Sequence, residues 1–415
     1  MKKKLLIYAH YFYPDVASTG QILTELTEGM RDTFDITVIC VVPSYNGTVE
    51  ERYKTKRIYR EEYKGMKIIR VRVPEFQKSN KISRIKNLVA YFINALLATF
   101  KIEKQDYIFT ISQPPILGGV LGVLGKGIKG GRLIYNIQDF NPEQTMAVGY
   151  SKNKLLLNLV MAVDKFSCKL SDKVIVVGRD MQETLKHRFN NKKVPKNVFI
   201  NNWINEKDIY PLGQNHPKII NFKEKYNLKD KFIIMYSGNI GLYYDLENII
   251  KVIGEFKDRE DVIFAFVGDG TVKDKVEAYV NENNLNNVTF IPYQDKADLI
   301  YSLNAADIHW VVNAKGIKGV SVPSKLYGVM AAGKPVLGVL DEGSEARLIV
   351  EESNCGVCIE PGNYKEIKNK INYILENKQK IKSLGQKGRI YLEQNLTKDV
   401  SINKYKEQIL MTDIR

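Results

Sequence analysis

The stretch FIIMYSGNIGLYYDLENIIKVIGEF, residues 232–256, decides the fold class. It begins with an apolar run of strand length, continues through a glycine-containing segment, and ends with apolar side chains at helical spacing over residues 245–256. A second apolar run follows at residues 262–267. Apolar strands that alternate with helices are typical of a parallel sheet in an α/β protein.

The same alternation extends outward over the whole chain. Further strands are predicted at residues 4–9, 36–42, 66–71, 107–111, 132–137 and 173–177, and then at 288–291, 308–312, 335–339 and 356–359. Between the two series lie a short strand at 198–200, a turn-rich segment at 201–205 and Pro211. We therefore predict two doubly wound, Rossmann-like domains, residues 1–200 and 201–395.

The positive charge is confined to the first half of the chain. Residues 1–200 hold 33 Lys+Arg and 18 Asp+Glu, a net charge of +15, whereas residues 201–415 hold 29 of each. This split indicates two domains with different partners, and an anionic partner for the first. We expect no specific nucleic-acid binding, because the basic residues form no recognisable RNA- or DNA-binding motif with interleaved aromatic residues.

Scarce cysteine and histidine exclude other classes of protein. Four Cys and four His are too few for a disulfide framework or a His-rich metal site. Cys355 and Cys358 have CxxC spacing without a second pair, which predicts two buried cysteines in or beside a strand. The apolar run after Lys4 is too short for a signal peptide, and no run reaches the roughly 20 residues of a membrane span. We expect a cytoplasmic protein.

Polar residues of the first domain follow three of its predicted strands. Because the carboxyl ends of parallel strands meet at one edge of a sheet, we expect these residues to line one crevice. Asp139 is placed there to accept a hydrogen bond from a sugar hydroxyl; the alternative is a turn that opens the next segment. The candidate ligand-binding residues at this edge are His10, Thr19, Gly20, Gln113 and Gln138, for which the family resemblance given below implies contact with an acceptor.

In the second domain, glycines follow two predicted strands. Gly238, Gly241 and Gly268 permit close approach of a ligand to the backbone. Ser324 and Lys325 follow Pro323 at a predicted helix start, where a hydroxyl, a cation and free N–H groups suit a diphosphate. The alternative is a surface lysine on a buried helix.

Five segments together resemble the retaining glycosyltransferases of family 4. They are YFYPDVASTGQ (11–21), QDFNPE (138–143), NNWIN (201–205), SGNIGLYYDLE (237–247) and PSKLYGVMAAGKPVLG (323–338). The segments follow the family's order over nearly the whole chain. Within the family, the chain looks most like the aminofucosyl-transferase-like branch of O-antigen and capsule polysaccharide assembly.

The resemblance implies a GT-B fold, in which two Rossmann-like domains face each other across a cleft. The second domain would hold the nucleotide-sugar, expected to be UDP-linked, and the first a lipid-linked saccharide. A C-terminal helix at about 396–415 would cross back to the first domain. The enzyme would be a hexosyl-type transferase (EC 2.4) that uses no metal and no cofactor. Asp139 and Lys325 are its candidate catalytic residues, and the donor phosphate would help to accept the acceptor's proton.

The chain departs from the family's pattern at several charged positions. Val320 and Gly328 stand where the family often carries a pair of Glu residues, and Gln138 stands where relatives have His. Asn239 and Tyr244 correspond to an Arg and a Lys of many relatives. Phosphate binding would then depend on Lys325, Lys318, Ser324 and backbone amides.

Two further donor contacts are implied by the resemblance. Tyr293 stands where relatives hold the base through backbone groups. Glu345 ends a segment like the family's Gly-rich loop, where it would contact ribose or sugar. Its alternative role is an acid at a helix N-terminus, where the helix dipole favours negative charge. The full candidate donor set is Gly238, Asn239, Gly241, Gly268, Tyr293, Lys318, Ser324, Lys325 and Glu345.

Residues 82–100 carry one apolar stripe at helical spacing, flanked by Lys78, Lys81, Arg84 and Lys86 at its start. The stripe favours a helix that packs its apolar face on the first sheet. The alternative is an interfacial helix on an anionic membrane surface, to which the basic run at residues 52–60 would add charge. That partner would place the protein at the inner face of the cell membrane.

Three functions remain open from the sequence. The first is a transferase that moves a sugar from a nucleotide-sugar to a lipid-linked saccharide in cell-surface polysaccharide biosynthesis. The second is a nucleotide-sugar epimerase of the same GT-B architecture, which would need no acceptor. The third is a non-catalytic protein that binds sugar or nucleic acid.

Overall fold

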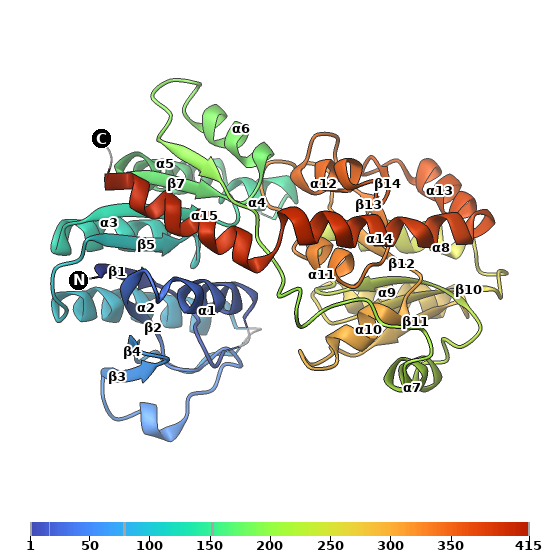
Figure 1. Ribbon diagram of the computed structural model, residues 1–415, viewed down its shortest axis with the longest axis horizontal. Coiled ribbons are helices and arrows are strands. Elements are labelled where there is room, and N and C mark those ends of the chain that lie inside the picture. Colours follow the sequence, from blue (N-terminus) through green and yellow to red (C-terminus); the bar gives the residue numbers. More distant parts are fainter. Residues whose placement is uncertain (1, 16, 78–79, 151–152, 414–415) are drawn as a thin grey trace.

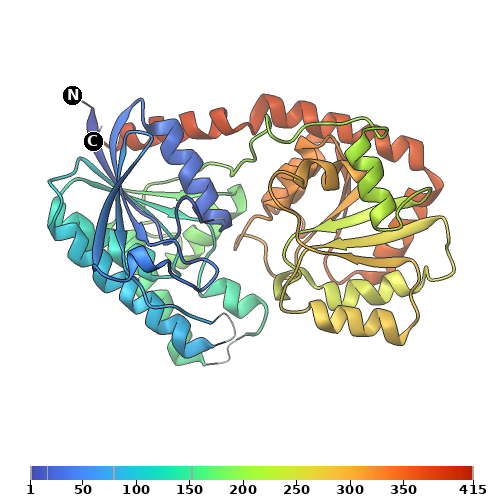
Figure 2. The ribbon, with the colours of Figure 1, turned by 90° about the horizontal axis from the view of Figure 1, so that it is seen from below.

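The computed structural model describes residues 2–15, 17–77, 80–150 and 153–413. The chain forms two lobes, each built on one sheet with helices on both faces (Figure 1). A long helix pair at the C-terminal end spans both lobes (Figure 2). The predicted architecture of two doubly wound α/β domains is confirmed.

The first sheet has eight strands in the order β3-β4-β2-β1-β5-β6-β7-β8. All neighbours are parallel except the antiparallel pair β3 and β4. The strands are β1 (Lys3–Tyr8), β2 (Phe34–Val41), β3 (Ile58–Tyr63), β4 (Met66–Val71), β5 (Tyr107–Ile111), β6 (Arg132–Ile137), β7 (Lys173–Val176) and β8 (Asn197–Phe199). The sequence analysis missed β3, whose charged side chains Arg60, Glu61 and Glu62 hide an edge strand.

The second sheet has six parallel strands in the order β11-β10-β9-β12-β13-β14. They are β9 (Phe232–Ser237), β10 (Val262–Val267), β11 (Val288–Ile291), β12 (Ile308–Val312), β13 (Val336–Val339) and β14 (Gly356–Ile359). Continuous apolar runs make these strands suit a sheet that is covered on both faces. The strand order reverses between β9 and β12, where doubly wound sheets open a crevice for ligands.

Helices cover both faces of each sheet. The first lobe holds α1 (Ser18–Met30), α2 (Lys81–Phe100), α3 (Leu117–Lys129), α4 (Glu143–Ala147), α5 (Lys154–Leu170), α6 (Arg179–Arg188) and the short η1 (Glu51–Tyr53). The second holds α7 (Pro217–Lys225), η2 (Leu242–Tyr244), α8 (Leu246–Gly254), α9 (Lys273–Glu282), α10 (Leu299–Ala305), α11 (Lys325–Ala331), α12 (Glu345–Ser353), α13 (Tyr364–Glu376) and α14 (Lys378–Asn395).

The last helix, α15 (Lys398–Leu410), returns to the first lobe and is followed by η3 (Met411–Asp413) (Figure 1). Its side chains Ile402, Tyr405 and Ile409 are buried in the same apolar cluster as the strands of the first sheet. The Tyr405 hydroxyl accepts a hydrogen bond of 3.1 Å from the Asn136 side chain on β6. The boundaries at residues 200 and 395 stay a prediction from the sequence.

The apolar stripe of residues 82–100 faces the sheet only in part: Phe92 and Leu96 pack against the core of the first lobe, whereas most of the other large side chains of the stripe are exposed. The fully buried residues of helix α2 are Asn87, Tyr91, Ala95, Ala98 and Thr99. These are mostly small or polar side chains, and they let the helix lie against the sheet. The larger aliphatic side chains on the opposite side are exposed to solvent. Lys78, one of the flanking basic residues, lies outside the described residues.

None of the described helices is both long and apolar enough to cross a lipid bilayer. Cys355 is buried just before β14 and Cys358 is half-buried within it, and both are free thiols. This agrees with the predicted pair of cysteines beside a strand.

Candidate active site

A cavity of about 250 Å³ lies beyond the carboxyl ends of β9, β10 and β11 and beside β12, whose His309 and Trp310 line it. It is at the point where the order of the second sheet reverses, which is where this type of sheet binds ligands. The predicted donor residues that line it are Gly238, Gly268, Tyr293, Ser324 and Lys325.

Two of these glycines are required by the backbone. Gly238 has φ +138°, and a Cβ atom there would lie 2.5 Å from Cε of Lys325. Gly268 has φ +136°, and a Cβ atom there would lie 2.2 Å from the Gly238 carbonyl oxygen. Side chains at either position would displace the lysine or the neighbouring strand end. The absence of side chains at these two positions thus allows the Lys325 side chain to lie across the end of the sheet.

Lys325 lies among aromatic rings. Its Nζ atom is 3.4 Å from the centre of the Tyr244 ring and 4.9 Å from that of Tyr236. Among the described residues, no carboxylate forms an ion pair with it, and burial lowers the pKa of the ammonium group to about 7. A cation held by rings without a counter-charge is suited to bind an anion that enters the cavity.

On the opposite side of the cleft, three predicted residues come together at the edge of the first sheet. The Thr19 hydroxyl donates a hydrogen bond of 2.6 Å to Oε1 of Gln113. Gln113 in turn hydrogen-bonds Asp139, although burial dominates and raises the pKa of Asp139 to about 6. Gly20 lies in the first turn of α1, which begins at Ser18.

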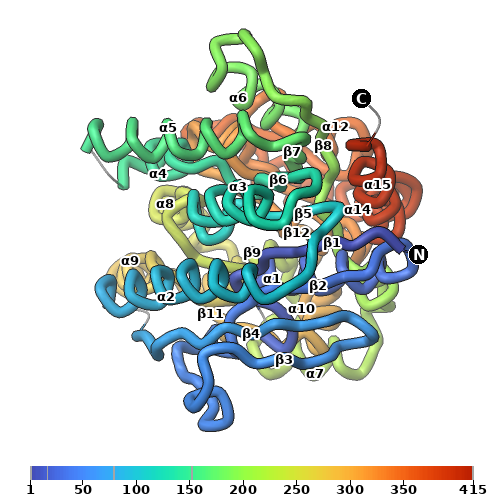
Figure 3. Tube along the Cα trace, turned by 90° about the vertical axis from the view of Figure 1, so that its left-hand side faces the viewer, coloured from blue at the N-terminus to red at the C-terminus, as the bar shows by residue number. Residues whose placement is uncertain are grey.

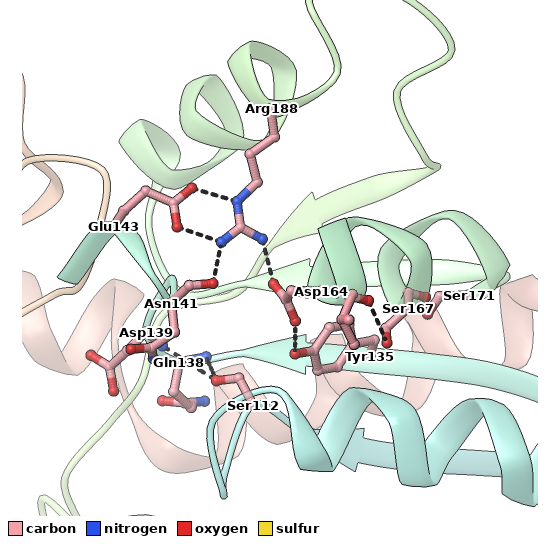
Figure 4. A network of polar contacts seen from close by, with 11 residues as sticks. Ser112, Tyr135, Gln138, Asp139, Asn141, Glu143, Asp164, Ser167, Ser171 and Arg188 are labelled. Atoms are coloured by element: carbon pink, nitrogen blue, oxygen red, sulfur yellow. Dashed lines mark hydrogen bonds and ion pairs between the residues drawn. The ribbon is translucent and has the colours of Figure 1, made fainter. Parts of the chain in front are cut away.

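Asp139 belongs to a loop that Arg188 of α6 holds in place (Figure 4). The buried guanidinium donates 2.5 Å hydrogen bonds to both oxygens of Glu143 and one of 2.8 Å to the Asn141 carbonyl. It also pairs with Asp164, which accepts a hydrogen bond of 2.7 Å from Tyr135. The Asp139 carboxyl group points away from this cluster (Figure 4), which leaves it outside the ion pairs.

The edges of the two lobes meet around Asp139. Its backbone forms an isolated antiparallel bridge with Ser321, and Phe140 donates a 2.9 Å hydrogen bond to the carbonyl of Val320. Burial, followed by the charge of Asp139, raises the pKa of Tyr244 to about 12. Tyr244 therefore has the charge of Asp139 on one side and Lys325 against its ring.

Three predicted residues are engaged elsewhere and do not face the cleft. Glu345 is 1% exposed, and its carboxylate accepts hydrogen bonds of 2.8 Å from the Arg179 backbone N–H, the Arg179 side chain and Asn201. It joins the two lobes, so the predicted ribose contact would require this ion pair to break. Gln138 is buried between Asn136 and Asn202.

His10 is the third such residue. Its ring packs 4.2 Å from that of Tyr11 and 4.9 Å from that of Tyr91, measured between ring centres. Burial lowers the pKa of the imidazole to about 4, so the ring is neutral at physiological pH. His10 therefore supports the packing of α2 on β1.

The remaining donor candidates lie near the cavity without lining it. Lys318 donates a 2.5 Å hydrogen bond to the carbonyl of Glu342 and so closes a loop of the second lobe. Asn239 accepts a 2.5 Å hydrogen bond at its carbonyl from the Tyr236 hydroxyl, and Gly241 follows it before η2. Both belong to the loop that positions Tyr244.

The sequence analysis missed part of the lining. Trp310 on β12 lines the cavity, and its indole N–H has no hydrogen-bond partner among the described residues. Gly328 lines it too, and an added Cβ there would contact Ile204 and Leu303 at an ordinary van der Waals distance of 3.5 Å. Trp310 lies in the middle of β12 and Gly328 on α11, the helix that follows this strand.

The sequence model of the family described as "Glycosyl transferases group 1" matches residues 218–391, which contain all of the cavity lining except Gln21 and Ile204. Over these residues the chain is similar to the group 1 glycosyl transferases. The chain is 29% identical over 336 residues to the "Probable glycosyltransferase WbjE" of Pseudomonas aeruginosa, covering 80% of this chain and 82% of that protein. It is 26% identical over 375 residues to the "Putative colanic acid biosynthesis glycosyl transferase WcaI" of Escherichia coli, covering 86% and 88%.

Solved structures share the fold at low sequence identity. Sucrose-phosphate synthase from Thermosynechococcus elongatus superimposes with a TM-score of 0.77 at 15% identity, covering 99% of each chain. Anabaena HepE, solved in complex with UDP and glucose, superimposes with a TM-score of 0.70 at 15% identity, covering 99% of this chain and 100% of HepE. The fold is GT-B.

Proposed function

We propose that the protein is a retaining glycosyltransferase that moves a sugar from a UDP-sugar to a lipid-linked saccharide in cell-surface polysaccharide biosynthesis. The observation that carries the proposal is Lys325, a lysine without an acidic partner among the described residues, which lines the cavity of the second lobe. The name of WcaI and the UDP bound to HepE support the polysaccharide and the nucleotide, respectively.

In this proposal Lys325 binds the diphosphate of the donor and stabilises the charge that develops on it as the sugar leaves. Such a group acts best where it is already in place and shielded from water. Gly238 and Gly268 allow the Lys325 side chain and the two strand ends to pack closely at the site where the diphosphate would bind. Asp139, across the cleft, accepts a hydrogen bond from the acceptor hydroxyl, while the donor phosphate helps to take up its proton.

Calorimetric titration with UDP, GDP and ADP in the presence of EDTA tests the donor site. We expect UDP to bind and GDP and ADP to bind more weakly, with no requirement for a divalent metal. Binding of none of the three would contradict the proposal and favour the non-catalytic function. Turnover of the UDP-sugar without any acceptor would instead favour the epimerase.

The pH dependence of transfer tests the roles of the two charged groups. Asp139, with a pKa of about 6, is a stronger hydrogen-bond acceptor as the carboxylate than as the neutral acid, so kcat/KM rises as the pH increases through 6. Lys325, with a pKa of about 7, must be protonated, so kcat/KM falls as the pH increases beyond 7. In the variant Asp139→Asn we expect the acid limb to be absent and the alkaline limb to remain. An unchanged acid limb would assign it to another group.

A further inference from the structure

Helix α2 exposes the side chains that a globular protein normally buries. Along its outer side run Ile82, Ile85, Val89, Ile93, Leu97 and Phe100, of which Ile82 is 67% and Ile85 59% exposed. The spacing of three to four residues makes them one continuous stripe. A monomeric soluble protein rarely leaves such a stripe in water, so it indicates a surface that another apolar phase covers.

Helix α5 shows the same reversed distribution of apolar and polar side chains as α2. It buries Asp164, Ser167 and Cys168 and directs large apolar side chains outward. The exposed residues are Leu155, Leu156, Leu159, Phe166 and Leu170, with Leu155 at 83% and Leu159 at 62%. Two helices far apart in the sequence therefore share the same unusual distribution of side chains.

Helix α3 lies between these two and completes one layer. It packs against both α2 and α5, and the three helices lie on the side of the first sheet away from α15 (Figure 3). Its inner face consists largely of glycine, so the helix lies close to the sheet; a Cβ on Gly118 would be 2.0 Å from the Ile111 carbonyl oxygen. We call the outer surface of α2, α3 and α5 the three-helix face.

The charges on this face are basic, and only Lys126 among them has an acidic partner, Asp172 just after α5, within the part of the chain that the structure describes. Helices α2 and α3 contain no Asp or Glu, and the single acid of α5, Asp164, is buried against Arg188. The basic residues of the three helices are Lys81, Arg84, Lys86, Lys126, Lys129, Lys154, Lys165 and Lys169. A second copy of the chain would present the same positive face, so self-association through it brings like charges together. An anionic lipid surface matches both the charge and the apolar stripes.

We propose that the three-helix face inserts its apolar side chains into the interfacial region of an anionic membrane leaflet, with the basic residues at the level of the lipid headgroups. The protein would then lie on the bilayer as an interfacial protein, held by two parallel helices. The apolar side chains provide the larger part of the binding free energy, since about 25 cal/mol is gained per Å² of apolar surface removed from water. The basic residues add roughly 1 kcal/mol each near an anionic surface.

This face leads directly to the candidate active site. Lys81, at the start of α2, lies 5.9 Å from the centre of the exposed Tyr150 ring. Burial raises the pKa of Tyr243, and the nearby charges of Asp139 and Tyr150 raise it further. A lipid-linked acceptor could thus reach Asp139 while its lipid stays in the leaflet. That last step rests on the proposed function, whereas membrane binding itself does not.

Co-sedimentation with vesicles tests the face. The test variant replaces Ile85, Ile93, Leu155 and Leu159 with Gln; the matched control replaces Ile390 and Leu410, which are exposed on α14 and α15 away from the face. We expect the wild type and the control to sediment with phosphatidylglycerol–phosphatidylethanolamine vesicles and less with phosphatidylcholine vesicles. The test variant should partition on the order of 100-fold more weakly. A third variant, Lys81→Gln, Arg84→Gln and Lys86→Gln, should bind less tightly and lose most of its salt dependence.

Two results would overturn the proposal. The first is a test variant that sediments like the wild type. The second is a wild type that ignores vesicles but forms a dimer or captures a protein partner that the test variant does not. UDP titration of every variant separates misfolding from loss of membrane binding. If UDP fails to bind while vesicles do, the proposed function falls and the membrane face remains.

Discussion

Replacing Lys325 with alanine is expected to lower kcat/KM for the UDP-sugar roughly 100- to 1,000-fold, the usual effect of removing one preorganised group that stabilises developing charge. The effect is large because, among the described residues, no other lysine or arginine except Lys296 lines the cavity, and Lys296 is paired with Glu25. The affinity for UDP should fall along with the rate. Initial rates and calorimetry on the same preparation measure both.

The pH dependence of UDP binding separates a direct role of Lys325 from a structural one. Because the free group has a pKa of about 7 and the diphosphate favours its protonated form, wild-type affinity should decrease as the pH rises above 7. Lys325→Ala should lack this decrease. Lys318→Ala is the matched control, since that lysine is bonded to a loop carbonyl outside the cavity. Equal losses in both variants would argue against Lys325 as the specific diphosphate ligand.

Replacing Arg188 with methionine is expected to reduce the free energy of unfolding by about 3–5 kcal/mol, the range found when one partner of a buried ion pair is removed. The guanidinium is the shared partner of Asp164 and Glu143 and lies 4.3 Å from the centre of the Phe140 ring. Methionine keeps part of the apolar packing but leaves the two carboxylates without their cation. Denaturant titration measures the change.

Two companion variants define the cause of that loss. Lys186 lies on the same helix and forms an exposed ion pair with Glu183. Lys186→Met should therefore change the free energy of unfolding very little. Adding Asp164→Asn to Arg188→Met removes one of the stranded charges and should recover part of the lost stability. If Arg188→Met is no less stable than Lys186→Met, the cluster in Figure 4 does not hold the Asp139 loop.

The fold could be predicted because its strands are nearly continuous apolar runs. Most predicted strands begin and end within a residue or two of the observed ones, since a strand buried on both faces leaves little choice of boundaries. β3 escaped because an edge strand with one face in water alternates polar and apolar residues, here in IYREEY. The stripe of α2 was recognised, but periodicity shows only that a stripe exists. Which side of the helix faces the protein is decided by the other side chains, because Asn87 and Ala95 are buried against the first lobe.

The site was predictable only where position alone decides it. Thr19, Gln113 and Asp139 follow strand ends of one parallel sheet and therefore meet. Gln138 and Glu345 are also polar residues that follow predicted strands. Their side chains, however, bind Asn202 and Arg179, which are distant in the sequence. Nothing local signals those pairings. The sequence analysis identified Tyr244 only as a position where many relatives carry a cation. The contact of its ring with Lys325 depends on how the segments around these two residues approach each other.

The return of α15 to the first lobe has a consequence for synthesis on the ribosome. Ile402, Tyr405 and Ile409 complete the interior of a lobe whose other residues emerge about 200 residues earlier. At 5–20 residues per second, that interior stays incomplete for roughly 10–40 s after its own sheet has left the exit tunnel. The nascent N-terminal lobe then exposes both its unfilled interior and the three-helix face. The N-terminal lobe is translated first but completes its fold last. Binding of a chaperone or a nearby bilayer would therefore protect this lobe more than the other during synthesis.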